Sequence, residues 1–273
     1  MVIPNFVSTN NNLPILREDK LLTAGSLLLV DFSHPLMSTS AIPANATTIK
    51  NIAYQEAMGL LSTTEANISP SIINTITPTG GLMEFTSKKG LHGIISQTND
   101  VLGGNDFKIG VPSAIKNYVF NNLSRGIFIS VWSASTRIST APQTNLDLTV
   151  FFNNTSNYVE MLKPSGFARP ANFRISRGNE IGNRIANVKL QPNTQGSPVV
   201  SNSFEFCFGS FSGISSANTA GSIILYQLHI VDLASAGLTY EQADALDLAN
   251  YNQAFGVGGR FASDTFTSPS TLA

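Results

Sequence analysis

Hydrophobic and polar residues alternate along three separate runs of the chain, at 146–152, 203–211 and 222–233. Alternation with a period of two is the pattern of a β-strand, because successive side chains point to opposite faces. In the first run Leu, Leu, Val and Phe alternate with Asp147 and Thr149, and in the second Phe204, Phe206 and Phe208 alternate with Glu205 and Cys207. In the third, Ile224, Tyr226, Leu228 and Ile230 are expected on one face. All three runs predict strands.

Two further runs are apolar on both faces. The segment "SLLLVDF" at 26–32 ends in a Ser-His-Pro turn and predicts a buried strand. In "GIFISVW" at 126–132, isoleucine and valine occupy one face and Phe128 and Trp132 the other. A strand with apolar residues on both faces is typical of one covered on both sides.

The segment 238–255 predicts a helix. Thr239 and Gln242 have the spacing of a capping box, and Leu238 and Ala243 that of a hydrophobic staple. We expect this helix to lie across one edge of the sheets, with one face towards the protein and the other towards solvent. The expected inner face consists of Tyr240, Ala243, Leu246 and Ala249, and the outer face of Glu241, Asp244 and Asp247. The segment 46–61 fits a helix and a strand about equally.

Short strands separated by polar turns, almost without helices, predict an all-β fold. We expect an antiparallel two-sheet β-sandwich, of jelly-roll type, with one short C-terminal helix near 239–252. Residues 1–25 are interpreted as an N-terminal arm, 26–255 as the sandwich domain and 256–273 as a C-terminal arm. No internal repeat is apparent.

The composition is unusual in having only 12% charged residues, where about 25% is typical. The formal net charge is -1 and the Lys and Arg residues are scattered, which argues against nucleic acid as a partner. The apolar runs are too short to cross a bilayer, and the first twenty residues lack the pattern of a signal peptide. The single Cys207 forms no internal disulfide. We therefore expect synthesis in a cytoplasm, without membrane insertion.

Candidate catalytic groups do not form a recognisable motif. His34, His92 and His229 show neither zinc-ligand spacing nor a nucleophile turn, which favours loop or packing roles. The glycine clusters are not followed by the helix of a phosphate-binding loop. We expect no cofactor, no metal and no catalytic residue.

A glycosidase is the enzymatic alternative. It requires two carboxyl groups about 5–9 Å apart. Glu84, Asp147 and Glu205 each stand alone on a short apolar segment. A partner from elsewhere in the fold would be needed, and the sequence leaves that alternative open.

Two sets of side chains are candidates for contacts. Trp132 and Tyr118 have the character of a sugar-binding platform, although a tryptophan on a central strand is more typical of a core. The segment 163–184 carries Arg169, Arg174 and Arg177 beside phenylalanines. We interpret it as an exposed loop that contacts a neighbouring subunit.

The C-terminal arm has its own pattern. Glycines at 256, 258 and 259 are suited to end the helix and reverse the chain. We expect Arg260, Phe261 and Phe266 to be anchor residues that hold the arm against its own domain or against a neighbouring protomer, as assembly contacts. The alternative is a frayed terminus beyond Phe266.

Several motifs together resemble a known family. "DFSHP", "TIKNIA", "SVWSASTRIS", "ILYQLHIVDLASAGLTYEQADALDLANYNQAF" and "GGRFASDTFTSPSTL" follow one another in the chain. This order is similar to that of concanavalin A-like, laminin-G-type sandwiches in structural proteins of tailed bacteriophages. The resemblance is most specific over 222–273 and looser over roughly 26–160.

The resemblance implies two packed antiparallel sheets and a non-enzymatic virion protein, located in the virion after synthesis in the host cytoplasm. Its role would be that of a tail or fibre component in adhesion or assembly. A capsid decoration protein and a glycan-binding or glycan-hydrolysing domain are the alternatives. The implied partners are other virion proteins, copies of the chain itself and, for adhesion, a host surface glycan. The calcium-binding motifs of true lectins are not recognisable.

Overall fold

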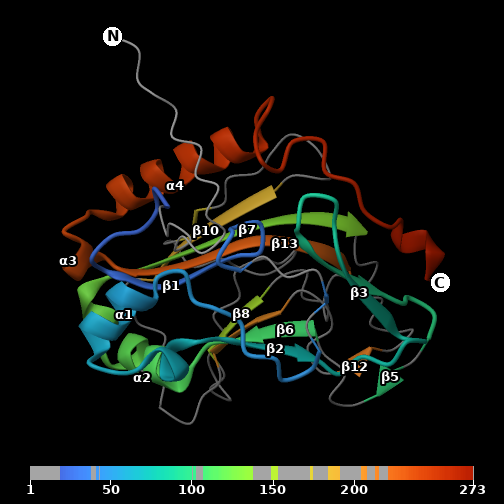
Figure 1. Ribbon diagram of the computed structural model, residues 1–273, viewed down its shortest axis with the longest axis horizontal. Coiled ribbons are helices and arrows are strands. Elements are labelled where there is room, and N and C mark those ends of the chain that lie inside the picture. The colour runs from blue at the N-terminus through green and yellow to red at the C-terminus, as the bar shows by residue number, and fades with distance from the viewer. Residues whose placement is uncertain are drawn as a thin grey trace, which may run out of the picture.

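The computed structural model describes residues 19–37, 41–42, 44–99, 101–102, 107–137, 149–152, 173–174, 184–190, 204–207, 213–214 and 221–272. These residues form mostly antiparallel β-sheet, and two sheets enclose a hydrophobic core in a β-sandwich-like arrangement (Figure 1). Helices cover one end and one outer face. The prediction of an antiparallel sandwich is confirmed at this coarse level.

The larger sheet is built around two long strands, β7 (Ile127–Arg137) and β13 (Ser222–Asp232). They pair along almost their whole length, and β13 is buried at every position. This explains their apolar sequences, because both faces of the strand are covered. The other strands of this sheet are β1 (Ser26–Asp31), β3 (Gly81–Phe85), β4 (Leu91–Ile95), β9 (Phe173–Arg174) and β10 (Arg184–Leu190).

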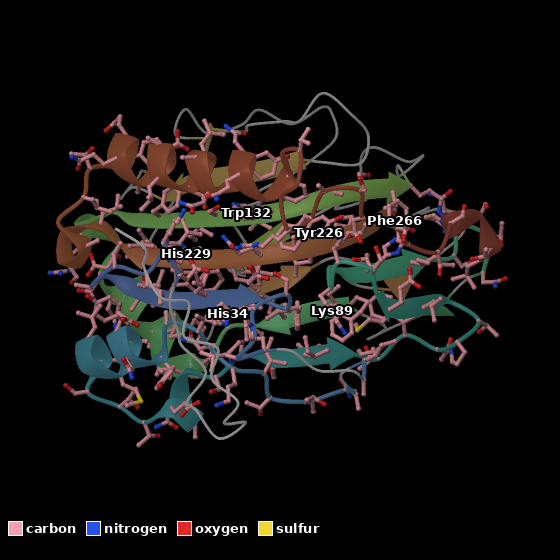
Figure 2. All side chains as sticks on the ribbon, turned by 45° about the horizontal axis from the view of Figure 1, so that its top comes forward. His34, Lys89, Trp132, Tyr226, His229 and Phe266 are labelled. Carbon is pink, nitrogen blue, oxygen red and sulfur yellow. The ribbon has the colours of Figure 1, made fainter. Side chains whose placement is uncertain are left out.

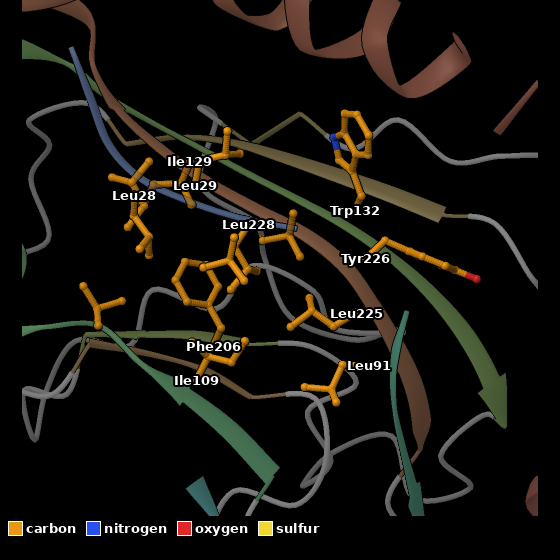
Figure 3. Packing of buried hydrophobic residues seen from close by; sticks show 14 of the residues in the cluster. Leu28, Leu29, Leu91, Ile109, Ile129, Trp132, Phe206, Leu225, Tyr226 and Leu228 are labelled. Carbon is orange, nitrogen blue, oxygen red and sulfur yellow. The ribbon is translucent and has the colours of Figure 1, made fainter. Parts of the chain in front are cut away.

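The smaller sheet contains β2 (Ser71–Asn74), β6 (Phe107–Gly110), β8 (Thr149–Phe152) and β11 (Phe204–Cys207). A separate pair joins β5 (Val101–Leu102) to β12 (Gly213–Ile214). Leu225 and Leu228 of the larger sheet lie towards Ile109 and Phe206 of the smaller one (Figure 3). All four are buried, so the core lies between the two sheets.

The expectation of an all-β fold with a single short helix is wrong in its helix content, because helices accompany the sheets. Over the described residues there are four α-helices, α1 (Tyr54–Leu61), α2 (Ser113–Asn121), α3 (Leu233–Ala236) and α4 (Tyr240–Phe255). The same part of the chain also contains three short 3-10 helices, η1 (Glu65–Ile68), η2 (Leu123–Arg125) and η3 (Pro269–Thr271). Helices α1 and α2 lie at one end of the sheets, and Ala57, Ile115 and Val119 are buried there in the core (Figure 1). The ambiguous segment is helical from Tyr54.

The loop before α1 is held by the amide side chain of Asn51. Its nitrogen donates to the carbonyls of Leu27 and Ile68, and its oxygen accepts from the amides of Leu29 and Ala53. A buried amide that makes all four hydrogen bonds leaves no polar atom unsatisfied. Asn51 therefore fixes the start of α1 against β1.

Helix α4 begins as predicted but lies elsewhere. The capping box of Thr239 and Gln242 is present, and Leu238 packs beside Ala243 in a small cluster under the helix. The helix covers the outer face of the larger sheet, over β7, β10 and β13, and not one edge (Figure 1). Its buried residues are Tyr240, Ala243, Asp247, Tyr251 and Ala254.

The expected inner and outer faces of this helix are therefore partly wrong. Asp247 is only 1% exposed, whereas Ala249 faces solvent. The positions 240, 243, 247, 251 and 254 follow the spacing of three or four residues that defines one helical face. The carboxyl group of Asp247 can be buried on that face because Ser130 and Trp132 of the sheet below donate hydrogen bonds to it.

The expected alternation in β13 is wrong at its centre. The pairing register with β7 shifts between Leu225 and Gln227. As a result Tyr226 contacts Phe255 of α4, and the next residue, Gln227, accepts a hydrogen bond from Arg260. A bulge places two successive side chains on one face, so Leu228 faces the inner core and not the side of Tyr226.

Candidate functional site

The C-terminal arm leaves α4 through a tight glycine turn. Gly258 has a φ of +76°, a conformation that glycine adopts without steric cost. A Cβ atom on Gly259 would lie 2.3 Å from the carbonyl oxygen of Gln253. The turn therefore requires glycine at both positions, and it sends the chain back across the outer face of the larger sheet.

Arg260 holds the first part of the arm. Its Nη2 lies 2.6 Å from Oδ2 of Asp31 and donates to Oε1 of Gln227 at 2.9 Å. The guanidinium also lies over the ring of Trp132, 5.4 Å from its centroid. Burial raises the pKa of Asp31, and the charge of Arg260 opposes that rise. Arg260 therefore joins the arm to β1 through Asp31, to β7 through Trp132 and to β13 through Gln227.

Phe261 is an internal anchor residue, with 2% of its surface exposed. Its ring centroid lies 4.6 Å from that of Tyr226 and 5.1 Å from that of Phe255. Trp132 joins the same aromatic cluster through Phe255 and Tyr251. Trp132 is thus buried, as expected, but between the sheet and α4 and not between the two sheets (Figure 3).

The middle of the arm is bound by hydrogen bonds to the β3–β4 turn. Asp264 accepts from the hydroxyl of Ser87, the amide of Lys88 and the hydroxyl of Tyr226, at 2.8–2.9 Å. The amide of Ser87 donates to the carbonyl of Thr265, and the amide of Thr265 donates to the hydroxyl of Ser87. This stretch therefore runs beside the turn much as an added strand would.

A chain of polar groups lies under the next arm residues. Both oxygens of Glu84 accept from Thr267, one from its amide at 2.8 Å and one from its hydroxyl at 2.6 Å. Glu84 also lies 2.9 Å from Nδ1 of His92, and Nε2 of His92 lies 2.8 Å from the hydroxyl of Thr136. The ring of Phe266 meets His92 edge-on at 5.2 Å. Figure 2 shows Trp132, Tyr226 and Phe266 following one another along the path of the arm.

The order carboxylate–imidazole–hydroxyl in Glu84, His92 and Thr136 is that of a nucleophilic triad. Hydrogen bonds from Thr267 and His92 lower the pKa of Glu84 against the effect of burial, and burial lowers the pKa of His92. The neighbouring Glu84 opposes this lowering of the His92 pKa. Because the arm occupies both oxygens of Glu84 and Phe266 covers His92, this cluster holds the arm in place.

The end of the arm is held by Arg137. Its Nη1 donates to the carbonyls of Pro269 and Leu272, each at 2.9 Å, and its Nη2 to the carbonyl of Ile95. Contacts of the arm with its own domain thus continue beyond Phe266 to residue 272. We name the side chains and backbone groups of Glu84, Ser87, Lys88, His92 and Arg137 the arm-binding surface.

A pocket of about 480 Å³ lies beside the glycine turn. Lys20, His34, Asn250, Gln253 and Arg260 supply its polar lining, together with Asp19. Lys20 donates to Oε1 of Gln253 at 3.1 Å. Three distant parts of the chain meet here, which places His34 at a pocket wall, a position that its sequence context alone did not predict.

Polar groups also lie between α4 and the sheet. Asp247 accepts from the hydroxyl of Ser130 at 2.7 Å and from Nε1 of Trp132 at 3.2 Å. Burial raises the pKa of Asp247 to about 7 and lowers that of His229 to about 3. We name Ser130, Trp132, His229 and Asp247 the helix-side layer. Asp247 was expected on the outer face of its helix, although its spacing from Tyr240 and Ala243 is a signal that could have assigned it to the buried one.

The remaining candidates are dispersed. Glu205 lies 3.3 Å from Lys108 within the smaller sheet, far in the topology from Glu84. Tyr118 donates to Asp232, which caps α3, so its hydroxyl has a structural partner. Arg174 lies in strand β9. Arg169, Arg177 and Asp147 lie outside the described residues.

In the part of the chain that the structure describes, no group of three or more His, Cys, Asp or Glu side chains is arranged to hold a metal ion. Within the same residues, no helix combines the length and apolar character needed to span a membrane. Comparisons of the chain with protein-family models, with curated proteins and with solved structures gave no match.

Proposed function

We propose that the chain is a non-enzymatic structural protein of a tailed-bacteriophage virion, with a concanavalin A-like jelly roll, that acts as a tail or fibre component in adhesion or assembly. One observation carries the proposal. The resemblance to such proteins is most specific in the region that includes "GGRFASDTFTSP". These same residues reverse the chain after α4 and bind the arm to its own domain. Arg260, Phe261, Asp264 and Thr267 each make a specific contact with the domain.

The carboxyl groups support a structural role. The carboxyl group of Glu84 is hydrogen-bonded to Thr267 and His92, and Asp247 is buried under α4. Neither lines the described pocket. A general acid or base must reach its substrate to within hydrogen-bond distance, and both groups are instead bound by their own fold. Their positions favour attachment of outer elements over catalysis.

Immunogold electron microscopy of particles purified from the lysate in which the chain is produced tests the proposal. We expect gold at the tail or its fibres. Gold over the head would replace the tail assignment by the alternative role of capsid decoration. Particles without gold, beside free antigen in the same lysate, would contradict a virion role altogether.

Glycan binding is the second candidate, and the pocket at His34 favours it. Side-chain amides such as those of Asn250 and Gln253 are donors and acceptors suited to sugar hydroxyls. The double variant Asn250→Ala/Gln253→Ala should then lose binding to host cells, whereas Asn252→Ala, exposed on the same helix, should retain it. Release of reducing sugar that Glu84→Gln, Asp147→Asn or Glu205→Gln abolishes would instead show a hydrolase.

A further inference from the structure

The arm divides into two parts that are attached in different ways. Phe261 is bound in the interior by an aromatic cluster, and the partly exposed side chain of Arg260 pairs with the buried carboxylate of Asp31. From Ala262 onwards the attachment is mainly polar, to the arm-binding surface. Phe266, the large apolar side chain in the middle of this outer part, is 40% exposed. Pro269 is buried, but most contacts of the outer part are hydrogen bonds, which water replaces when this part detaches.

A strained residue joins the two parts. Ser263 has a φ of +56°, in the left-handed region that residues other than glycine rarely adopt. It directs the chain from the buried Phe261 into the extended stretch along the β3–β4 turn. An extended conformation at Ser263 would relieve this strain and would carry residues 264–272 away from their own domain.

The arm-binding surface lies at the rim of the molecule. The chain terminates at the end where β3 and the β3–β4 turn lie, away from α1 and α2 (Figure 1). The arm-binding surface is made by residues 84–137 and the arm by residues far later in the chain, and Glu84 and Thr267 are 183 residues apart. An arm from a second copy can make the same hydrogen bonds, since the surface recognises only the arm itself.

We propose that residues 262–272 exchange between neighbouring copies of the chain, each arm binding the arm-binding surface of the next copy, with Ser263 as the hinge. The proposal rests on the assembly role proposed above and names its partner, a second copy. Within one chain the short connection gives the arm a high effective concentration, of the order of millimolar. Exchange therefore takes place where assembly or high concentration brings copies together, and the intrachain arrangement predominates in dilute solution.

Disulfide trapping between two different single variants tests the exchange. Ser87 and Thr265 are both exposed, and their backbones are hydrogen-bonded at 2.9 Å. A disulfide requires Cα atoms about 4.4–6.8 Å apart, and the backbone hydrogen bond brings Ser87 and Thr265 into direct contact. Ser87→Cys and Thr265→Cys are made in separate chains that also carry Cys207→Ser, and the two proteins are mixed and oxidised at rising concentration.

We expect a covalent Ser87→Cys–Thr265→Cys heterodimer whose yield rises with concentration towards about millimolar. Gly59→Cys, exposed in α1 at the other end of the molecule, replaces Ser87→Cys in the control mixture. The double variant in one chain shows that the pair can close internally when dilute. Closure in that chain, with a heterodimer yield no higher than the control at any concentration, would overturn the exchange. Gold labelling of particles together with that result would leave the virion role standing and remove only the exchange.

Discussion

The helix-side layer and the arm-binding surface both use a carboxylate to hold an outer element on the same sheet, but at opposite extremes of burial. Asp247 is fully enclosed under α4 and has a raised pKa, about 7. Glu84 lies at the rim, and hydrogen bonds lower its pKa. Burial penalises the charged form, whereas donors favour it. The attachment of α4 should consequently weaken as pH rises, and that of the arm as pH falls. Substitutions beneath α4 should also lower the stability of the protein more than substitutions in the arm-binding surface.

The largest effect is expected where the two regions meet, at Phe261. Phe261→Ala removes a buried ring from the cluster with Tyr226 and Phe255 and should lower the free energy of unfolding by about 3–5 kcal/mol. Chemical denaturation measures the change. Val257→Ala, in the same turn but fully exposed, should have almost no effect. Equal losses in the two variants would mean that Phe261 is not part of the core.

The second prediction concerns Asp247. Its folded pKa, about 7, exceeds the unfolded value near 3.8, so the folded state binds the proton more tightly. Stability from this group is full below about pH 4 and falls as pH rises to about 7, by about 3–4 kcal/mol. Denaturation across this range, compared with Asp247→Asn, measures the dependence.

The asparagine variant keeps an acceptor for Ser130 and Trp132 but carries no titrating group. Its stability relative to the wild type should therefore improve as pH rises. A difference that stays constant between about pH 4 and about pH 8 would show that Asp247 is not the buried acid described here.

Glu84→Gln should release the outer arm with a smaller cost. Hydrogen bonds to a charged acceptor contribute about 1.5–3 kcal/mol, so protection of the Thr267 amide from hydrogen exchange should fall about tenfold or more. The folded pKa of Glu84 lies below its usual value near 4.5, and its contribution is lost as pH falls through that folded value. Arm protection should decline in acid while α4 is retained.

Glu65→Gln is the matched control for this variant. Glu65 forms an exposed pair with Lys50 at 3.7 Å, away from the arm. Exposed pairs contribute little, so exchange at Thr267 should not change. Protection that is lost equally in both variants would point to a general effect of charge.

The smallest effect is expected at Phe266. Because its ring is 40% exposed and meets only an edge of His92 in the described contacts, Phe266→Ala should cost about 1 kcal/mol or less in the isolated domain. Leu82→Ala, similarly exposed on β3, serves as the control. A loss as large as that for Phe261→Ala would erase the distinction between the inner and outer parts of the arm.

The sequence predicted those features that short segments encode. Strands β1, β7, β11 and β13 follow from local alternation or apolar runs, and the start of α4 follows from Thr239 and Gln242. Helix α2 was missed, and α1 was left open. Both are short, and their helical form depends on burying a few side chains against the sheets, which local propensity does not report.

Long-range contacts decided the candidate site. The Glu84–His92 pair requires the hairpin register of β3 and β4, and the Thr267 contact joins positions 183 residues apart. In the sequence Glu84 stands as an isolated acid, because Thr267, which binds it, comes from another part of the chain. Asp247 was expected on the outer face of its helix for the same reason, since the groups that donate hydrogen bonds to it, on Ser130 and Trp132, belong to β7.

By itself the sequence determined the strand-forming runs, the capped helix and the glycine turn that follows it, because these depend on neighbours in the chain. Only the tertiary structure decided the bulge in β13, the side that Asp247 faces and the surface that receives the arm. Each of these rests on hydrogen bonds and burial between distant segments, whose stabilisation appears only after the sheets have assembled.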